Sequence, residues 1–152
     1  MVEPGAMSGS YFHVGLIVAK LEPALVELTA LLGLTWRDIY DGEVPVHRSD
    51  TGEGSVPLRF AYSQEHPYLE VIEDAPGTPW ALNEHGSNLH HLGFYVDDVT
   101  SESERVAGSF CPIEVCGLGP DGQHPVNFSY HERDGLRIEL VDVATRSFMF
   151  GS

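Results

Sequence analysis

A short fragment that occurs twice constrains the fold of this chain more than any other feature. Phe12–Val18 (FHVGLIV) returns as His90–Val96 (HHLGFYV), 78 positions further along. Each copy is later followed by a strand-like run with a glutamate at its centre, Tyr68–Glu73 and Arg137–Asp142. A histidine strand followed by a glutamate strand, used twice at so long a spacing, indicates a duplicated unit rather than a solenoid.

The predicted secondary structure has the same order in both copies, namely a strand, a helix and three further strands. In the first copy, a helix begins near Pro23 and ends at Gly33, and strands are expected at 11–18, 34–40, 58–63 and 68–73. A Gly/Pro/Asp-rich connection through Pro57 separates the second strand from the third. The second copy has strands near 91–96, 113–116, 126–130 and 136–143 and a more polar helix near 100–107. The fold class is therefore α+β, with two βαβββ modules.

The length and composition favour a single folded domain. The chain has 152 residues, 42% of them hydrophobic and 20% charged, which is enough to bury a core. We predict a disordered N-terminus at 1–10 and one domain at 11–150. Module one is expected at 11–74, a connector at 75–88 and module two at 89–148.

Strand alternation selects four candidate metal ligands. Apolar residues alternate along the strands of His13, His91, Glu70 and Glu139, and these apolar residues require the face of the sheet that the helices cover. The four ionisable side chains must then point to the opposite face, and the same alternation selects His91 rather than His90. Such groups are costly to bury unless they are paired or bound to a cation. Two imidazoles and two carboxylates suit one divalent ion, Zn, Ni, Co, Mn or Fe(II), with positions left open.

The charge balance narrows the expected partners. Lys and Arg number 8 against 23 Asp and Glu, a formal net charge of −15. Such a surface repels phosphate backbones and anionic lipid, so we expect a small-molecule substrate and neither nucleic acid nor membrane. The first residues lack the basic-then-apolar pattern of a secretion signal, so we expect no such leader. The spacing of Cys111 and Cys116 fits neither a zinc knuckle nor a redox pair, which indicates reduced thiols in a cytoplasmic protein.

With these residues identified, the chain resembles the vicinal oxygen chelate superfamily, which includes glyoxalase I, methylmalonyl-CoA epimerase, extradiol dioxygenases and the bleomycin resistance proteins. The resemblance extends from Tyr11 to about Phe148 and includes the helix end Leu31–Leu34. It implies that the paired modules form a cupped, incomplete β-barrel around the metal. It also implies that the chain is most similar to His-Glu-His-Glu members such as bacterial glyoxalase I. Epimerases usually carry glutamine at the position of Glu70.

The resemblance implies a metal-dependent isomerase or lyase that removes a proton next to a carbonyl and forms a metal-stabilised enolate. In glyoxalase-like members a ligand glutamate acts as the base, a role that falls here on Glu139 or Glu70. Glu43 is an alternative base, although a loop acid is more often a solvated surface residue.

Candidate substrate contacts follow from strand alternation. Arg137 and Tyr68 are expected beside their glutamates, and Tyr62 and Tyr130 hold comparable places in the two copies. Arg137 suits a substrate carboxylate or phosphate. Equally, it could sit at the rim and pair with a surface acid.

Two other function classes stay open. A non-haem Fe(II) dioxygenase needs only His13, His91 and Glu139, but Glu70 would then crowd the positions for O₂ and substrate. A metal-free binding or resistance protein of this fold usually lacks the complete ligand set. For each reading we expect a homodimer, because an incomplete barrel leaves sheet edges that need cover and relatives of this fold usually pair.

Overall fold

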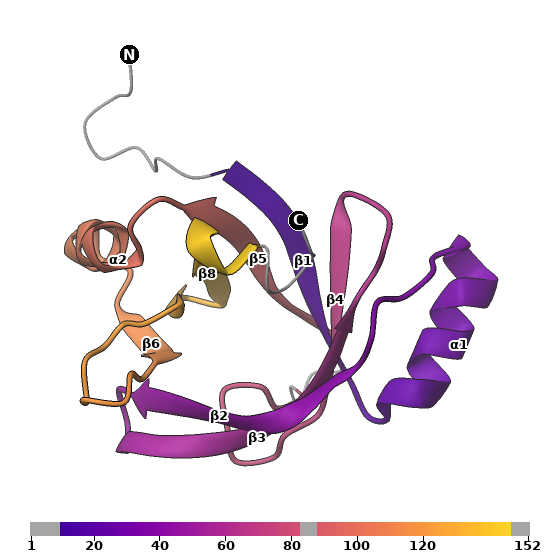
Figure 1. Cartoon of the computed structure of the whole chain (residues 1–152), viewed down its shortest axis with the longest axis horizontal. Helices are drawn as coiled ribbons and strands as arrows, with labels where there is room; N and C mark the ends of the chain where they lie inside the picture. Colours follow the sequence, from indigo (N-terminus) through magenta and orange to yellow (C-terminus); the bar gives the residue numbers. More distant parts are fainter. Residues whose placement is uncertain (1–9, 83–87, 147–152) are drawn as a thin grey trace. The chain divides into compact units, whose positions relative to one another are not determined.

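The computed structural model describes residues 10–82 and 88–146 (Figure 1). The elements are β1 (Ser10–Val18), α1 (Leu21–Leu32), β2 (Tyr40–Arg48), β3 (Gly52–Tyr62), β4 (Tyr68–Glu73), β5 (Leu89–Val96), α2 (Val99–Gly108), β6 (Ile113–Gly117), β7 (Phe128–Arg133), β8 (Leu136–Asp142) and a 3₁₀ turn at Val143–Thr145. The order is strand, helix and three strands, twice over. Ser10, expected in the disordered N-terminus, begins β1. Residues 1–9, 83–87 and 147–152 lie outside the described residues. The predictions for most of the N-terminus, for part of the connector and for the end of module two fall in these ranges.

The stretch between α1 and β4 differs from the prediction. Most of the strand expected at 34–40 is irregular, and the expected connection through Pro57 is a hairpin of β2 and β3. Pro45 and Pro57 suggested a break in the chain, but both are exposed and each is next to a buried residue, Val46 and Val56. The alternation typical of strands is therefore present, and the breakers are tolerated because they occupy its outward positions.

By its internal contacts the chain divides into two compact units. Of the described residues, the N-terminal unit comprises 12–44, 56–82 and 88–92, and the C-terminal unit comprises 10–11, 45–55 and 93–146. In the N-terminal unit, β1 is parallel to β4, which is antiparallel to β3. Helix α1 ends at Gly33, whose φ of 72° is the left-handed conformation that glycine favours. The helix packs on the sheet through a core that contains Leu21, Leu25, Ala61 and Val71.

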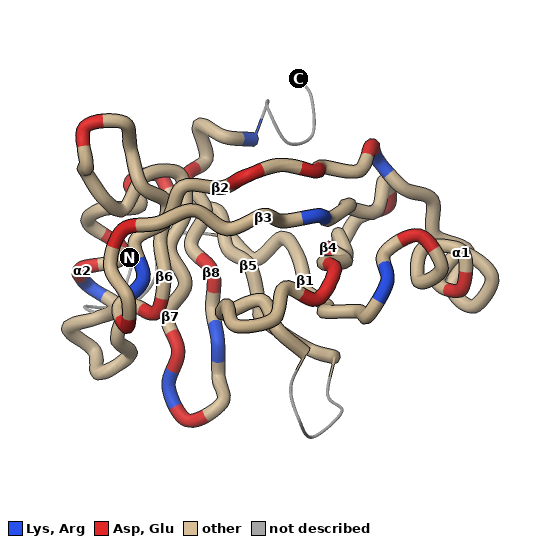
Figure 2. Tube along the Cα trace, turned by 90° about the horizontal axis from the view of Figure 1, so that it is seen from below, with Lys and Arg blue, Asp and Glu red and all other residues tan. Residues whose placement is uncertain are grey.

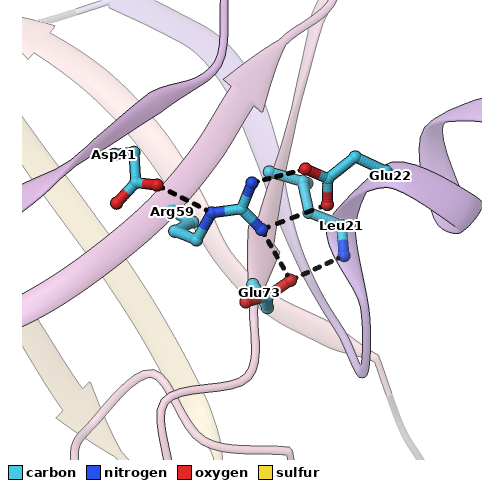
Figure 3. A network of polar contacts seen from close by, with 5 residues as sticks. All are labelled: Leu21, Glu22, Asp41, Arg59 and Glu73. Carbon is cyan, nitrogen blue, oxygen red and sulfur yellow. Dashed lines mark hydrogen bonds and ion pairs between the residues drawn. The ribbon is translucent and has the colours of Figure 1, made fainter.

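An arginine on β3 holds the start of α1 against the sheet (Figure 3). The guanidinium of Arg59 donates to the carboxylates of Glu22, Asp41 and Glu73. Glu73 also accepts the backbone N–H of Leu21 at 2.9 Å, which satisfies one of the unpaired donors at the helix start. The hydrogen bond from Arg59 lowers the pKa of Glu22 to about 2. These contacts fix where α1 covers β4.

The C-terminal unit repeats this arrangement. Strands β6, β7 and β8 are antiparallel neighbours. Asp98 caps the start of α2, and its side chain accepts hydrogen bonds from the backbone N–H groups of Thr100 and Ser101. The helix packs on the sheet through Val96, Val99, Val106 and Leu140.

One strand pairing inside the C-terminal unit was not predicted. The hairpin that replaces the expected connection pairs at Val46–Arg48 with β6. The two helices and eight strands of the described residues confirm the α+β class. The cupped, incomplete barrel and the homodimer stay predictions.

Acidic side chains outnumber basic ones along the chain (Figure 2). In the part of the chain that the structure describes, ion pairs with carboxylates are formed by Arg48, Arg59, Arg105, Arg133 and Arg137. Much of the scarce positive charge is thus already neutralised within the protein. Neither helix in the described residues has the length and apolar character of a membrane span.

A buried histidine joins α2 to β7. His131 is fully buried, and its Nε2 lies 2.7 Å from the Ser103 hydroxyl on α2. Its Nδ1 donates to the carbonyl of Cys111 at 2.9 Å. Because the carbonyl only accepts, the neutral ring carries its proton on Nδ1 and Nε2 accepts the serine hydroxyl. Sequence analysis gave this residue no role, and the structure assigns it to the packing of the C-terminal unit.

We expect His131 to make the protein less stable in acid. Burial lowers its pKa, against the raising effect of the bond to Cys111. The folded state thus binds this proton less readily than the unfolded state, so stability is complete above about pH 6.5 and falls as the pH drops below that value. His131→Gln should weaken this pH dependence in urea denaturation. His131→Ala should also cost about 1–3 kcal/mol at pH 8 by leaving buried groups unsatisfied. Exposed His124→Ala is the matched control, and an equal effect of the two alanine variants would contradict the assignment.

Candidate metal centre

Three of the four predicted ligands lie together in the N-terminal unit. His13 is on β1, Glu70 on the adjacent β4 and His91 on β5. On β1 the buried side chains of His13 and Ile17 alternate with half-buried apolar ones, as the sequence predicted. On β4, Val71 belongs to the core under α1, so Glu70 projects from the other face.

The donor atoms of these three side chains form a compact triangle. Nε2 of His13 lies 2.7 Å from Nε2 of His91. Oε1 of Glu70 lies 3.3 Å from the first nitrogen and 3.2 Å from the second. All three side chains are buried, with exposed fractions of 0%, 4% and 5% for His13, His91 and Glu70. Two ring nitrogens and a carboxylate oxygen therefore converge on one point inside the protein.

The electrostatic surroundings keep Glu70 charged. Burial alone raises the pKa of its carboxyl, but the contacts with the rings of His13 and His91 outweigh this effect. The result is a pKa well below its ordinary range. A carboxylate that stays ionised in a buried place marks the point as a site for positive charge.

The set fits a divalent metal ion in both chemistry and spacing. Ligands bound at about 2.1 Å and at right angles to each other lie about 3.0 Å apart, close to the observed sides of the triangle. Imidazole and carboxylate are ligands shared by Zn, Ni, Mn and Fe(II). His13, Glu70 and His91 can hold such an ion without rearrangement of their elements.

A glycine makes room for the His91 ring. Gly15 lies two residues after His13 and opposite Glu70 in the β1–β4 register. A Cβ atom at Gly15 would lie 2.1 Å from Cε1 and 2.4 Å from Nδ1 of His91. The ring thus occupies the space that any side chain at this position would fill. Glycine at this position therefore lets the His91 ring lie beside His13 and Glu70.

His90 lies beside the candidate site, although strand alternation selected His91 rather than His90 as the ligand. The ring of His90 contacts its neighbour, with Nδ1 2.8 Å from Nδ1 of His91. Its Nε2 lies 2.7 Å from the carbonyl oxygen of Pro79. Strand alternation predicts the face of the sheet toward which the Cβ atom points. It does not predict the orientation of the ring beyond the Cβ atom.

Glu139, the fourth predicted ligand, lies on β8 in the C-terminal unit and is 7% exposed. It is the counterpart of Glu70 in the repeat. Tyr62 is opposite Glu70 between β3 and β4, and Tyr130 is opposite Glu139 between β7 and β8. Tyr62 and Tyr130 thus hold equivalent places, as the sequence indicated, and both are buried.

The remaining candidates have varied surroundings. Tyr62 packs edge-on against His13 with ring centroids 5.3 Å apart. Tyr68 is opposite His13 in the β1–β4 register and is half-buried. Arg137 forms a two-bond ion pair with Glu114, Nε to Oε1 at 2.7 Å and Nη2 to Oε2 at 2.9 Å. Pairing with an acid is one of the two alternatives that the sequence left open for Arg137, and its position at a rim stays a prediction. Glu43 is an exposed residue of β2 rather than of a loop.

Comparisons with known proteins agree with this geometry. The family model of the glyoxalase/bleomycin resistance protein/dioxygenase superfamily matches residues 12–109. Methylmalonyl-CoA epimerase from Mycobacterium tuberculosis is 18% identical, with 93% of this chain and 92% of that chain covered and a TM-score of 0.60. A variant of the Streptomyces coelicolor epimerase in complex with 2-nitronate-propionyl-CoA is 16% identical, over 88% of this chain and 93% of that one, with a TM-score of 0.61. A hypothetical protein from Bacillus halodurans C-125 is 14% identical, over 89% and 94%, also at 0.61. At these identities the likeness shows a shared fold. No curated protein matches the chain.

Proposed function

Because the chain belongs to the glyoxalase/bleomycin resistance protein/dioxygenase superfamily, we propose that it is a metal-dependent isomerase or lyase that removes a proton next to a carbonyl group. The observation that carries this proposal is the buried triangle of His13, Glu70 and His91, with sides of 2.7, 3.3 and 3.2 Å. Such a cluster is costly to bury without a cation. A divalent ion bound there supplies the positive charge that stabilises a developing enolate oxygen.

In this proposal Glu139 completes the set of four ligands. Its support is the repeat, in which both glutamates are buried and each is opposite a buried tyrosine. The ion itself is one of Zn, Ni, Co, Mn or Fe(II), since the donor set does not distinguish among them.

The two glutamates differ in their suitability as the base. Glu70 contacts both imidazole rings, at 3.3 and 3.2 Å, which suits a ligand that stays in place. We therefore propose Glu139 as the base, with Glu70 as the alternative. Glu70 keeps the charge that holds the cation.

The substrate is proposed to be a small molecule with two adjacent oxygens. The structural neighbours include an epimerase in complex with methylmalonyl-CoA, which makes this thioester the first compound to test. The net charge of −15 opposes the phosphates of such a ligand. Phosphate-free α-hydroxycarbonyl compounds, which carry the same two oxygens, should be tested beside it. Tyr62 and Tyr68 are the proposed contacts in the N-terminal unit.

The test is solvent deuterium exchange with protein purified without chelator and loaded with Zn²⁺, Ni²⁺ or Co²⁺. We expect deuterium at the carbon next to the carbonyl, in the absence of O₂, because proton transfer requires no redox change. Strict dependence on Fe(II) with consumption of O₂ would indicate the dioxygenase reading instead. Tight substrate binding by metal-stripped protein with no exchange would indicate a binding protein.

A further inference from the structure

Two consecutive histidines form a buried chain of hydrogen bonds beside the candidate metal centre. His90 is 7% exposed and His91 4%. One ring nitrogen of His90 contacts the carbonyl oxygen of Pro79 and the other contacts Nδ1 of His91. All three residues belong to the N-terminal unit. The direction of each hydrogen bond follows from what each atom can donate or accept.

The carbonyl of Pro79 can only accept, so Nε2 of His90 carries a proton and donates it over 2.7 Å. A neutral imidazole has one N–H, and a second proton on this ring would place a cation in a buried position. Nδ1 of His90 is then an acceptor. The 2.8 Å contact requires a donor opposite it, so Nδ1 of His91 carries a proton. The lone pair of His91 is left on Nε2, the atom that faces His13 and Glu70.

We propose that His90 is a positioning residue that keeps the proton of His91 on Nδ1 and thereby presents the lone pair of Nε2 for metal binding. The inference rests on the proposed metal site. The identity of the protonated ring nitrogen in a ligand histidine is set by the hydrogen bond that the other nitrogen makes. Here the acceptor is the preceding residue of the same strand, itself oriented by the Pro79 carbonyl.

The first measurement is Zn²⁺ affinity by calorimetry. His90→Phe keeps a ring of similar size but removes the acceptor, and we expect affinity to fall about 10–100-fold, the usual effect of losing such a partner. His90→Asn keeps an acceptor close to the position of Nδ1 and should retain much of the affinity. His124→Phe, at an exposed histidine, is the matched control and should bind Zn²⁺ as the unmodified protein does.

The second measurement separates positioning from a general packing effect. In the Zn²⁺-loaded protein, NMR should show a slowly exchanging Nδ1–H of His91. This proton should persist in His90→Asn and be lost or exchange rapidly in His90→Phe, while thermal unfolding confirms that both variants fold.

The outcomes separate this inference from the metal site itself. If the unmodified protein binds Zn²⁺ and His90→Phe binds it equally tightly, with the Nδ1–H signal unchanged, the role of His90 is overturned and the site stands. A proton found on Nε2 of His91 in the Zn²⁺-loaded protein would overturn it as well. If the unmodified protein takes up no Zn²⁺, the metal site and this inference fall together.

Discussion

A Gly15→Ala variant is expected to lose metal affinity by about a hundredfold or more, because a methyl group cannot share the space of the His91 ring. The added Cβ would lie 2.1, 2.4 and 2.7 Å from Cε1, Nδ1 and Nε2 of that ring. The ring has little room to move, since His13, Glu70 and His90 contact it on other sides. Packed interiors do not absorb such an overlap without displacement of a side chain. Calorimetric titration with Zn²⁺ measures the loss directly.

The chain offers a matched control for this substitution. Gly54 also lies on a strand, has no atom within 4 Å of an added Cβ and does not adopt a left-handed conformation. Gly54→Ala should therefore bind Zn²⁺ normally. The double variant Gly15→Ala/His91→Ala should bind no more weakly than His91→Ala alone, because both changes remove the same ligand. Normal affinity in Gly15→Ala would show that His91 does not bind the metal in the observed orientation.

Much of the site could be predicted from the sequence because alternation is a strong constraint on a strand that is covered on one face. His13 and Glu70 each have apolar neighbours that need a helix, so the ionisable side chain must point the other way. The repeat also predicted that Tyr62 and Tyr130 hold comparable places in the two copies. The registers agree, since Tyr62 lies opposite Glu70 and Tyr130 lies opposite Glu139.

The features that the sequence did not predict depend on contacts between different strands and loops. Strand alternation describes a single strand and contains no information about such contacts. The β2–β3 hairpin was missed because Pro45, Gly52 and Pro57 indicate turns locally, although pairing with neighbouring strands overrides that preference. The bond between His90 and the Pro79 carbonyl depends on where a loop crosses β5. The pairing of Arg137 with Glu114 depends on the strand that lies across β7. No periodic signal carries such information.

The second large effect is expected at Glu139. A Glu139→Gln variant should bind Zn²⁺ within about tenfold of the unmodified protein. It should turn over about 10²–10⁴-fold more slowly, which is the usual contribution of a general base. Glutamine keeps the size of the side chain and an oxygen that can act as a weak ligand, but it cannot accept a proton. Turnover measured at saturating metal isolates proton transfer from metal loss, and deuterium exchange at the substrate carbon should slow by the same factor.

Glu70→Gln is the matched variant, because the two glutamates hold equivalent places in the repeat and differ in their surroundings. The negative charge of Glu70 lies beside both candidate ligand rings and favours a divalent cation there. Its loss should therefore chiefly weaken metal binding, and activity should return as the Zn²⁺ concentration is raised. The expected contrast is thus a metal-dependent defect at Glu70 and a metal-independent defect at Glu139. The reverse pattern would exchange the two roles. Full activity of Glu139→Gln at saturating metal would show that Glu139 is not the base. Glu43 on β2 would then be the first other acid to test.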